Sequence, residues 1–271
     1  MDRLRTLVST LATAGFVAPE EEANDLLARA GDDDARLEVL LGRRLTGEPL
    51  AWITGRISFC DLELRVDPGV YVPRWHTELL ARRAAELLPP SGTAVDLCTG
   101  TGAIARTLCA AHPGARVQAT DTDDRAVACA RANGVEAYCG DLFAPLPGTL
   151  EGRVDLVVGV VPYVPTPALA LLQRDTLTFE STLSYDGGPD GTDILRRVVT
   201  ESPRYLRPGG KVLLEVGGDE SDALTVTRAM AVPDVVARVP GLATVTVLET
   251  DQVKVTWPVE EALSVTVMVT G

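Results

Sequence analysis

The sequence predicts an α/β fold in which helices cover both faces of a parallel sheet. From Thr93 onward, short apolar runs alternate with segments whose apolar residues recur at helical spacing. A glycine-containing turn joins the first of these runs to the helix that follows it. The chain has 271 residues, long for one compact domain and short for two large ones. We therefore expect one core domain with a smaller appendage.

Residues 1–55 predict the appendage, a small helical domain. Apolar residues recur at helical spacing between Leu4 and Leu11, and again at 23–27 and 37–41. Pro19 breaks the first pair of helices, and the aspartates of segment 31–34 can cap the next helix.

Residues 56–75 predict a β-hairpin linker, because Asp67-Pro68-Gly69 is a turn sequence between two β-prone segments. The third unit, 76–271, then begins with a helix from His76 to Leu88, which the following prolines end.

The core of this third unit is expected to alternate strands and helices. The predicted strands are 94–98, 115–121, 135–141, 154–160 and 211–217. The predicted helices are 103–111, 124–133, 194–206 and 222–232. Segments 242–251 and 263–271 alternate polar and apolar residues without a helix between them, so we expect an antiparallel pair at the end of the sheet.

Composition narrows the class of protein. No apolar run is long enough to cross a bilayer, and the N-terminus lacks an apolar signal core, so we expect a cytoplasmic protein without membrane contacts. A formal net charge of −13 disfavours nucleic-acid partners. Five cysteines without a C-x-x-C pair, and only two histidines, predict neither disulfides nor a metal site. The oligomeric state is left open.

The segment AVDLCTGTGAIA, residues 94–105, is the most informative motif. A buried strand ends near Asp96, a turn carries Gly100 and Gly102, and a helix follows. Glycines in such a turn allow a ligand to approach the backbone amides at the helix N-terminus. The next strand ends at Asp121, at the spacing of about 20 residues where a carboxylate reaches a ribose diol.

A glycine turn of this type is also typical of nicotinamide-binding proteins. Asp96, however, would repel a pyrophosphate and hold a cationic amino group. Asp141, in the GDLF segment after the third strand, is expected beside an adenine. These two carboxylates favour S-adenosylmethionine as the cofactor. A dehydrogenase and an idle doubly wound domain remain the alternatives.

Several collinear blocks resemble the HemK/PrmC family of protein-(glutamine-N5) methyltransferases. These blocks are GEPLAWITGRISF, DPGVYVPRWHTELL, DLCTGTGAIA, ATDTDDRAVACARAN, GDLF, VDLVVGVVPYVP, FES…YDGGPDGTDILRRVV and PRYLRPGGKVLLEVG. The resemblance runs from about residue 40 to 218. It implies a Rossmann-like, seven-stranded class I methyltransferase core that binds S-adenosylmethionine and follows a helical N-terminal domain.

The resemblance also implies a set of cofactor-binding residues. They are Tyr71, Arg74, Thr77, Asp96, Cys98, Thr99, Gly100, Gly102, Asp121, Thr122, Asp141, Leu142 and Val160. Thr77 has an equal alternative as the cap of the following helix. Glu180 matches an acidic position of the family, with a solvated loop carboxylate as its alternative.

The catalytic segment departs from the family. Where the family has Asn-Pro-Pro-Tyr, this chain has Val160, Val161, Pro162 and Tyr163. In the family, the asparagine side chain and the following carbonyl hold the amide nitrogen of the substrate glutamine. Such a nitrogen is a poor nucleophile because its lone pair is delocalised into the carbonyl. A valine cannot replace this contact, which is typically worth about 2.7–4 kcal/mol if oxyanion-hole deletions are a guide.

The altered segment favours a different acceptor, so we expect an N-methyltransferase of specialised metabolism that acts on a small-molecule amine or indole-type nitrogen. The alternatives are a protein-(glutamine-N5) methyltransferase acting on release factors or a ribosomal protein, and an inactive cofactor-binding relic. His76 or Glu180 can serve as a base. The expected substrate-binding residues are Trp52, Trp75, His76, Tyr163 and Glu180. For Trp52, Trp75 and His76, a place in the core or at the surface is the alternative.

Overall fold

The computed structural model describes residues 3–172 and 174–216, together with short strands at 236–237, 244–248, 252–256 and 265–270. The helix expected at 222–232 lies outside the described residues.

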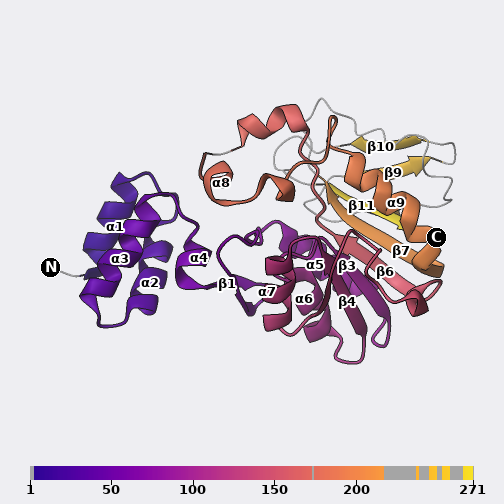
Figure 1. Cartoon of the computed structure of the whole chain (residues 1–271), viewed down its shortest axis with the longest axis horizontal. Helices are drawn as coiled ribbons and strands as arrows, with labels where there is room; N and C mark the ends of the chain where they lie inside the picture. Colours follow the sequence, from indigo (N-terminus) through magenta and orange to yellow (C-terminus); the bar gives the residue numbers. More distant parts are fainter. Residues whose placement is uncertain are drawn as a thin grey trace.

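Four helices form the N-terminal region, which stands to one side of the sheet in Figure 1. They are α1 (Arg3–Thr13), α2 (Pro19–Ala30), α3 (Asp34–Leu45) and the short α4 (Leu50–Thr54). Leu11 and Leu26 are fully buried where these helices pack together. Asp33 Oδ1 accepts a hydrogen bond of 2.9 Å from the Arg36 backbone N–H, which confirms the predicted aspartate cap of α3.

A two-stranded antiparallel hairpin follows, formed by β1 (Arg56–Phe59) and β2 (Leu62–Arg65). Its turn is Cys60-Asp61, and both residues have positive φ, as a two-residue hairpin loop of this type requires. The expectation that Asp67-Pro68-Gly69 turns the hairpin is therefore wrong, because that segment follows β2. The division into domains at residues 55 and 75 stays a prediction.

The remaining elements build the core. The helices are α5 (Thr77–Leu87), α6 (Ala103–Ala111), α7 (Asp124–Ala132), α8 (Arg174–Phe179) and α9 (Asp193–Tyr205). Short 3-10 turns are η1 (Gly148–Leu150), η2 (Thr166–Leu171) and η3 (Thr182–Ser184). The strands are β3 (Thr93–Leu97), β4 (Arg116–Asp121), β5 (Glu136–Cys139), β6 (Val154–Gly159), β7 (Leu206–Val216), β8 (Val236–Ala237), β9 (Thr244–Leu248), β10 (Gln252–Thr256) and β11 (Val265–Thr270).

The main sheet has the order β11-β7-β6-β3-β4-β5 within the described residues. Its strands are parallel except β11, which pairs antiparallel with β7. These strands and helices place the chain in the Rossmann-like α/β class predicted from the sequence. Six strands of this sheet are described where seven are expected. Segments 244–248 and 265–270 do not pair with each other as predicted, because β9 pairs with β10 and β8 in a separate sheet.

Helices cover both faces of the main sheet, as the alternation of its apolar side chains requires. Leu156, Val158 and Leu213 belong to the core cluster that also contains buried residues of α5, α6 and α7. Val157 and Leu214 belong to the cluster shared with α9 on the other face. The successive side chains of a strand point to opposite faces, so β6 and β7 contribute to both layers.

The order of the strands fixes where a ligand can bind. From β3 the chain builds outward through β4 and β5, then returns to place β6 on the other side of β3. The loops after β3 and β6 therefore diverge at the carboxyl edge, which is where open parallel sheets bind their ligands. Asp96, Asp121 and Val160 all lie at this edge.

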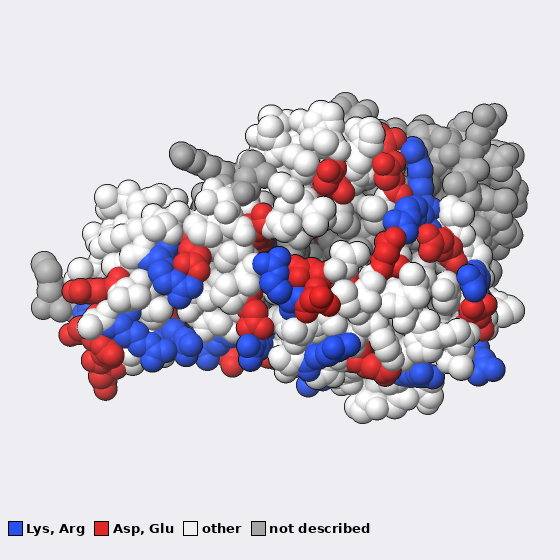
Figure 2. Space-filling view, in the orientation of Figure 1, with Lys and Arg blue, Asp and Glu red and all other residues white. Residues whose placement is uncertain are grey.

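Charge is mixed over the surface drawn in Figure 2, where acidic and basic side chains lie next to one another. In the helical region, Arg43 pairs with Glu48 at 2.5 Å and Arg44 with Glu22 at 2.6 Å. Within the described part of the chain, no helix has the length and apolar character needed to cross a membrane.

Candidate active site

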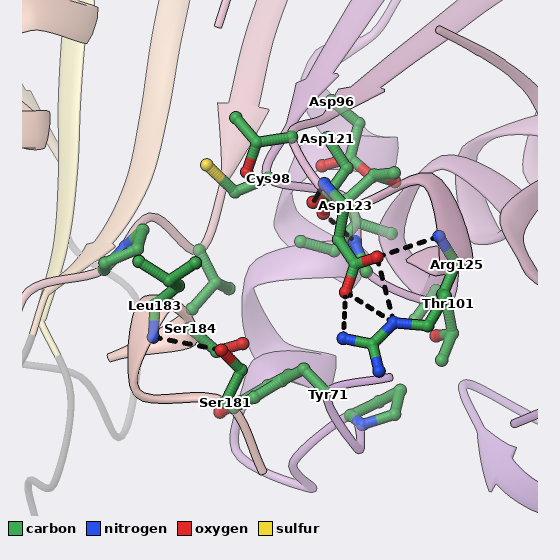
Figure 3. A pocket seen from close by; sticks show the side chains of 18 of the residues that line it. Tyr71, Asp96, Cys98, Thr101, Asp121, Asp123, Arg125, Ser181, Leu183 and Ser184 are labelled. Carbon is green, nitrogen blue, oxygen red and sulfur yellow. Dashed lines mark hydrogen bonds and ion pairs between the residues drawn. The ribbon is translucent and has the colours of Figure 1, made fainter. Parts of the chain in front are cut away.

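A cavity of about 510 Å³ lies at the carboxyl edge of the main sheet. The loops after β3, β4 and β6 form one part of its lining, and segments 71–77 and 181–184 form the rest. Figure 3 shows Asp121 and Asp123 on one side of this cavity, with Ser181, Leu183 and Ser184 across from them. Segments far apart in the sequence therefore line the same cavity.

Asp96 contributes a buried acceptor to the cavity lining. Its Oδ2 accepts hydrogen bonds from the Thr99 hydroxyl at 2.6 Å and from the Ala105 backbone N–H at 3.2 Å. Its Oδ1 is buried and has no hydrogen-bond partner within the described residues. Complete burial raises the pKa of Asp96 to about 7. An unpaired carboxylate oxygen in this place fits a cationic amino group of a ligand.

Asp121 ends β4 and contributes a second carboxylate. Its Oδ2 accepts a hydrogen bond of 2.9 Å from the Gly100 N–H, and its Oδ1 accepts one of 3.0 Å from the Asp123 N–H. Burial raises its pKa, while these backbone donors act in the opposite direction. Carboxylate oxygens can accept more than one hydrogen bond each, so Asp121 can also accept from the hydroxyls of a ribose.

The two glycines of the turn have different structural roles. Gly100 lines the cavity with a φ of +56°, close to the Tyr71 backbone. Gly102 has a φ of +80° and lies where an added Cβ would be 3.0 Å from the side chains of Ala130 and Val135. Its lack of a side chain therefore allows α6 to begin against α7 and β5, and Gly102 does not line the cavity.

Three polar side chains and one backbone N–H fasten segment 71–74 to segment 180–185. Glu180 Oε1 accepts a hydrogen bond of 3.0 Å from the Val72 N–H, and Oε2 accepts one of 2.6 Å from Arg74 Nη2. The Tyr185 hydroxyl also donates to Glu180 and accepts from Arg74 Nη2 at 2.9 Å. The rings of Tyr71 and Tyr185 meet edge to face, with centroids 5.6 Å apart.

This cluster explains how Tyr71 and Arg74 come to line the cavity although they precede the core sheet. The Glu180 side chain is only 3% exposed, so the alternative of a solvated loop carboxylate is wrong. Glu180 does not line the cavity itself. It holds in place two residues that do.

The structure gathers most of the predicted cofactor-binding residues around the cavity. Those lining it are Tyr71, Arg74, Thr77, Asp96, Cys98, Thr99, Gly100, Asp121, Thr122 and Val160. Thr77 is the first residue of α5, and the N-cap position belongs to His76, so the alternative that Thr77 caps this helix is not supported. Their role in binding a cofactor stays a prediction.

Asp141 and Leu142 differ from that group. Asp141 points to the surface, where it forms an ion pair of 2.7 Å with Arg197 and its side chain is 57% exposed. Leu142 is buried in the core with a positive φ of 45°. Neither lines the cavity. The expected position of Asp141 beside an adenine is therefore not the one that its side chain occupies here.

The two tryptophans expected in the substrate site lie elsewhere. Trp52 is buried, and its indole N–H donates a hydrogen bond of 2.9 Å to the Val70 carbonyl. Its ring contacts Phe179 edge to face. Trp75 is 75% exposed, and neither tryptophan lines the cavity. The structure thus corrects both expectations in favour of their alternatives, the core for Trp52 and the surface for Trp75.

The altered catalytic segment follows β6 directly. Val160 and Pro162 line the cavity, whereas Val161 is 1% exposed and belongs to the core cluster on the α9 face. Tyr163 packs against the same cluster, and burial raises its pKa. The side chains that this segment turns toward the cavity are therefore apolar.

The partly exposed His76 pairs with the buried Glu215, which lies in the strand next to this segment. His76 Nε2 lies 3.3 Å from Glu215 Oε1, and Glu215 is 2% exposed. Glu215 Oε2 is buried without a hydrogen-bond partner within the described residues. Sequence reasoning missed Glu215, although a charged residue within the apolar run KVLLEV was a visible signal.

Further lining residues were also missed. They are Pro73, Thr101, Ala103, Ile104, Asp123, Asp124, Arg125, Ser181, Leu183 and Ser184. Asp123 caps α7 and pairs with Arg125 at 2.8 Å, and the run TDTDDR that contains both follows the predicted strand directly. No local pattern marks 181–184, because its place depends on the fold.

The residues present fit S-adenosylmethionine. Asp96 Oδ1, which has no partner among the residues described, can accept from an ammonium group, and Asp121 ends the neighbouring strand where hydroxyls can be bound. The Gly100 backbone lies open to the cavity between them. The site therefore has the donor and acceptor set of a nucleoside-and-amino-acid ligand.

The fold and this site define an S-adenosylmethionine-dependent methyltransferase. The model of the methyltransferase small domain family matches residues 62–144, which include β3, the glycine turn and Asp121. S-adenosylmethionine is accordingly the cofactor of this chain.

The chain belongs to the release factor glutamine methyltransferase (HemK/PrmC) family. It is 38% identical to the release factor glutamine methyltransferase of Mycolicibacterium smegmatis, over 83% of this chain and 88% of that protein. It is also 38% identical to that of Moorella thermoacetica, over 80% and 85%. The Cereibacter sphaeroides enzyme is 33% identical, over 88% and 95%. A solved ribosomal protein L11 methylase from Lactobacillus delbrueckii subsp. bulgaricus is similar with 21% identity and a TM-score of 0.40, covering 57% of this chain and 67% of that chain.

These relatives contradict the expectation of a small-molecule acceptor. Each of the three is named for a protein substrate, and each is similar to this chain over most of its length. The sequence-based preference rested on the catalytic segment, in which Val160 and Val161 replace the asparagine and the first proline of the family motif. It gave the loss of the asparagine side chain more weight than the resemblance of the other blocks to a family that methylates proteins.

Proposed function

We propose that this chain methylates the side-chain amide nitrogen of a glutamine in a release factor. The observation that supports this most strongly is its 38% identity to the Mycolicibacterium smegmatis enzyme over 88% of that protein. Release factors act at ribosomes, so this function places the chain in the cytoplasm.

The cofactor side of the site supports this proposal. When bound, S-adenosylmethionine supplies an electrophilic methyl group on a sulfonium sulfur. Asp96 Oδ1 would hold the ammonium group of the amino-acid moiety, and Asp121 would accept from the ribose hydroxyls. The cluster around Glu180 fixes the segment that carries Tyr71 and Arg74, which would lie against the cofactor. These residues would align the methyl donor and exclude water from it.

Val160 and Pro162 line the cavity, and in this proposal they form the side that receives the acceptor. Because a carboxamide nitrogen is weakly nucleophilic, its orientation dominates the reaction rate. The Val160 side chain shapes the cavity and excludes water from it. The backbone carbonyls of the segment can accept hydrogen bonds from the amide. A release factor can bring one glutamine into such a narrow site while its own surface remains outside.

The proposal is tested with purified protein, S-adenosylmethionine carrying a labelled methyl group, and an unmethylated release factor. We expect label on the release factor, and peptide mass spectrometry should locate it on one glutamine. The Asp121→Ala variant is the control for cofactor dependence, and a release factor with that glutamine changed to alanine is the control for position. A chain that binds the cofactor but leaves every release-factor glutamine unmethylated would contradict the proposal.

A further inference from the structure

Glu215 lies beside the altered catalytic segment. Strands β6 and β7 are parallel neighbours, with Val158 opposite Leu213 and Gly159 opposite Leu214. The next residues in this register are Val160 and Glu215. Side chains two apart in a strand share a face, and Val158 and Leu213 belong to the same core cluster. Val160 packs against that cluster too, so Glu215 is adjacent to the position that holds asparagine in the family motif.

The Glu215 carboxylate is incompletely bonded. Oε1 lies 3.3 Å from His76 Nε2, but Oε2 is buried and has no hydrogen-bond partner among the described residues. Leaving a buried charged oxygen unpaired is costly, so native structures rarely do so without a functional reason. The same carboxylate acts on the hydroxyls of Tyr71 and Tyr163, since it helps to raise the pKa of each after the larger effect of burial.

We infer that Glu215 Oε2 is the acceptor that holds the N–H of the substrate glutamine amide in place of the missing asparagine side chain. This inference rests on the proposed function, and it deepens it by assigning the recognition of the acceptor nitrogen. A carboxylate accepts hydrogen bonds but donates none, so it selects a carboxamide over a carboxylate.

The inference is tested by binding two peptides that differ at one position, one with glutamine and one with glutamate. Affinities are measured by calorimetry with S-adenosylhomocysteine present. We expect the unchanged protein to prefer the glutamine peptide. Glu215→Leu should weaken glutamine-peptide binding by about 10-fold to 100-fold and remove the preference over glutamate. Glu215→Gln retains an acceptor and should keep intermediate affinity for the glutamine peptide.

Rescue provides the second measurement. Adding Val160→Asn to Glu215→Leu returns an acceptor from the neighbouring strand, and should restore the glutamine preference and most of the methylation rate. Glu201→Gln, an exposed change on α9, is the control for altered charge. A merely structural role for Glu215 would lower both peptide affinities together and would not respond to Val160→Asn.

Two failures are distinguishable. If the unchanged protein methylates the release factor and Glu215→Leu keeps both affinity and preference, this inference is wrong while the proposed function stands. If the unchanged protein binds the cofactor but neither binds the glutamine peptide nor methylates release factor, the proposed function itself fails.

Discussion

The cofactor side and the acceptor side of the cavity differ in how their polar groups are supplied. On the cofactor side, Asp96 and Asp121 stand at the ends of adjacent strands within one continuous stretch of sequence. On the proposed acceptor side, Val160 and Pro162 present apolar surface, and the carboxylate that we assign to the acceptor, Glu215, comes from a different strand. The carboxylates of the cofactor side therefore come from one local stretch of sequence. The carboxylate of the acceptor side comes from a strand that only the sheet brings close.

This difference shows why a motif on one strand is an incomplete description of a site. Replacing a polar residue at the carboxyl end of β6 changes the chemistry of the site only if the end of β7 offers no substitute. Glu215 is buried, and its Oε2 has no hydrogen-bond partner among the described residues, so we propose it as the substitute within the same layer of the sheet. Changes confined to one side can therefore separate the two functions.

Asp121→Ala should have the largest effect on cofactor binding. This change removes the carboxylate that we propose as the ribose acceptor, and it releases the Gly100 and Asp123 N–H groups that Asp121 now binds. We expect the affinity for S-adenosylhomocysteine to fall by about 100-fold or more, as calorimetry can measure.

Glu151→Gln is the matched control, since the Glu151 side chain lies at the surface in an ion pair with Arg204, outside the cavity lining. Unchanged cofactor affinity in Asp121→Ala, with the fold preserved by circular dichroism, would show that the cofactor side does not depend on this carboxylate.

Asp96 should make the free energy of unfolding depend on pH. Its pKa is about 7 in the folded protein and 3.8 in an unperturbed aspartate, so between these values the folded state keeps a proton that the unfolded chain has lost. The free energy of unfolding of the ligand-free protein should therefore decrease as pH rises from about 4 to about 7, with Asp96 contributing up to about 1.4 kcal/mol per pH unit.

Denaturant titrations at several pH values measure this slope. Asp96→Asn should reduce it, and Asp121, whose pKa burial also raises, should account for part of the remainder. An identical slope in Asp96→Asn would mean that Asp96 is ionised throughout this range. The acceptor side, tested by Glu215→Leu, should leave the Asp96 contribution in place.

The smallest expected effect is that of Val160→Asn, which tests whether the proposed acceptor side lacks a polar contact. Val160→Asn in the otherwise unchanged protein adds a second polar group beside Glu215, and should raise kcat/KM for release factor by about 10-fold. Cofactor affinity should not change. Val39→Asn, an exposed change on α3, controls for the added amide. If Val160→Asn gives no gain while cofactor affinity is kept, the acceptor side already has its full set of polar contacts.

The sequence by itself determined the α/β core, the helical N-terminal region, the methyltransferase class and the cofactor. The core and the helical region follow from local apolar periodicity. The class and the cofactor were predicted from the Gly100 turn with its carboxylates, together with the resemblance of several collinear blocks to one family. Each local pattern lies within a few tens of residues, where the geometry of strand, turn and helix dictates which side chains meet.

Only the tertiary structure decided which more distant residues join the cavity. Glu180 is buried because Arg74 and Val72 arrive from a segment more than 100 residues earlier in the chain. Trp52 lies in the core because the Val70 carbonyl satisfies its N–H. Glu215 stands next to Val160 because parallel pairing aligns two strands that are separated in sequence. Such contacts depend on packing across the whole sheet, so no single stretch of sequence predicts them.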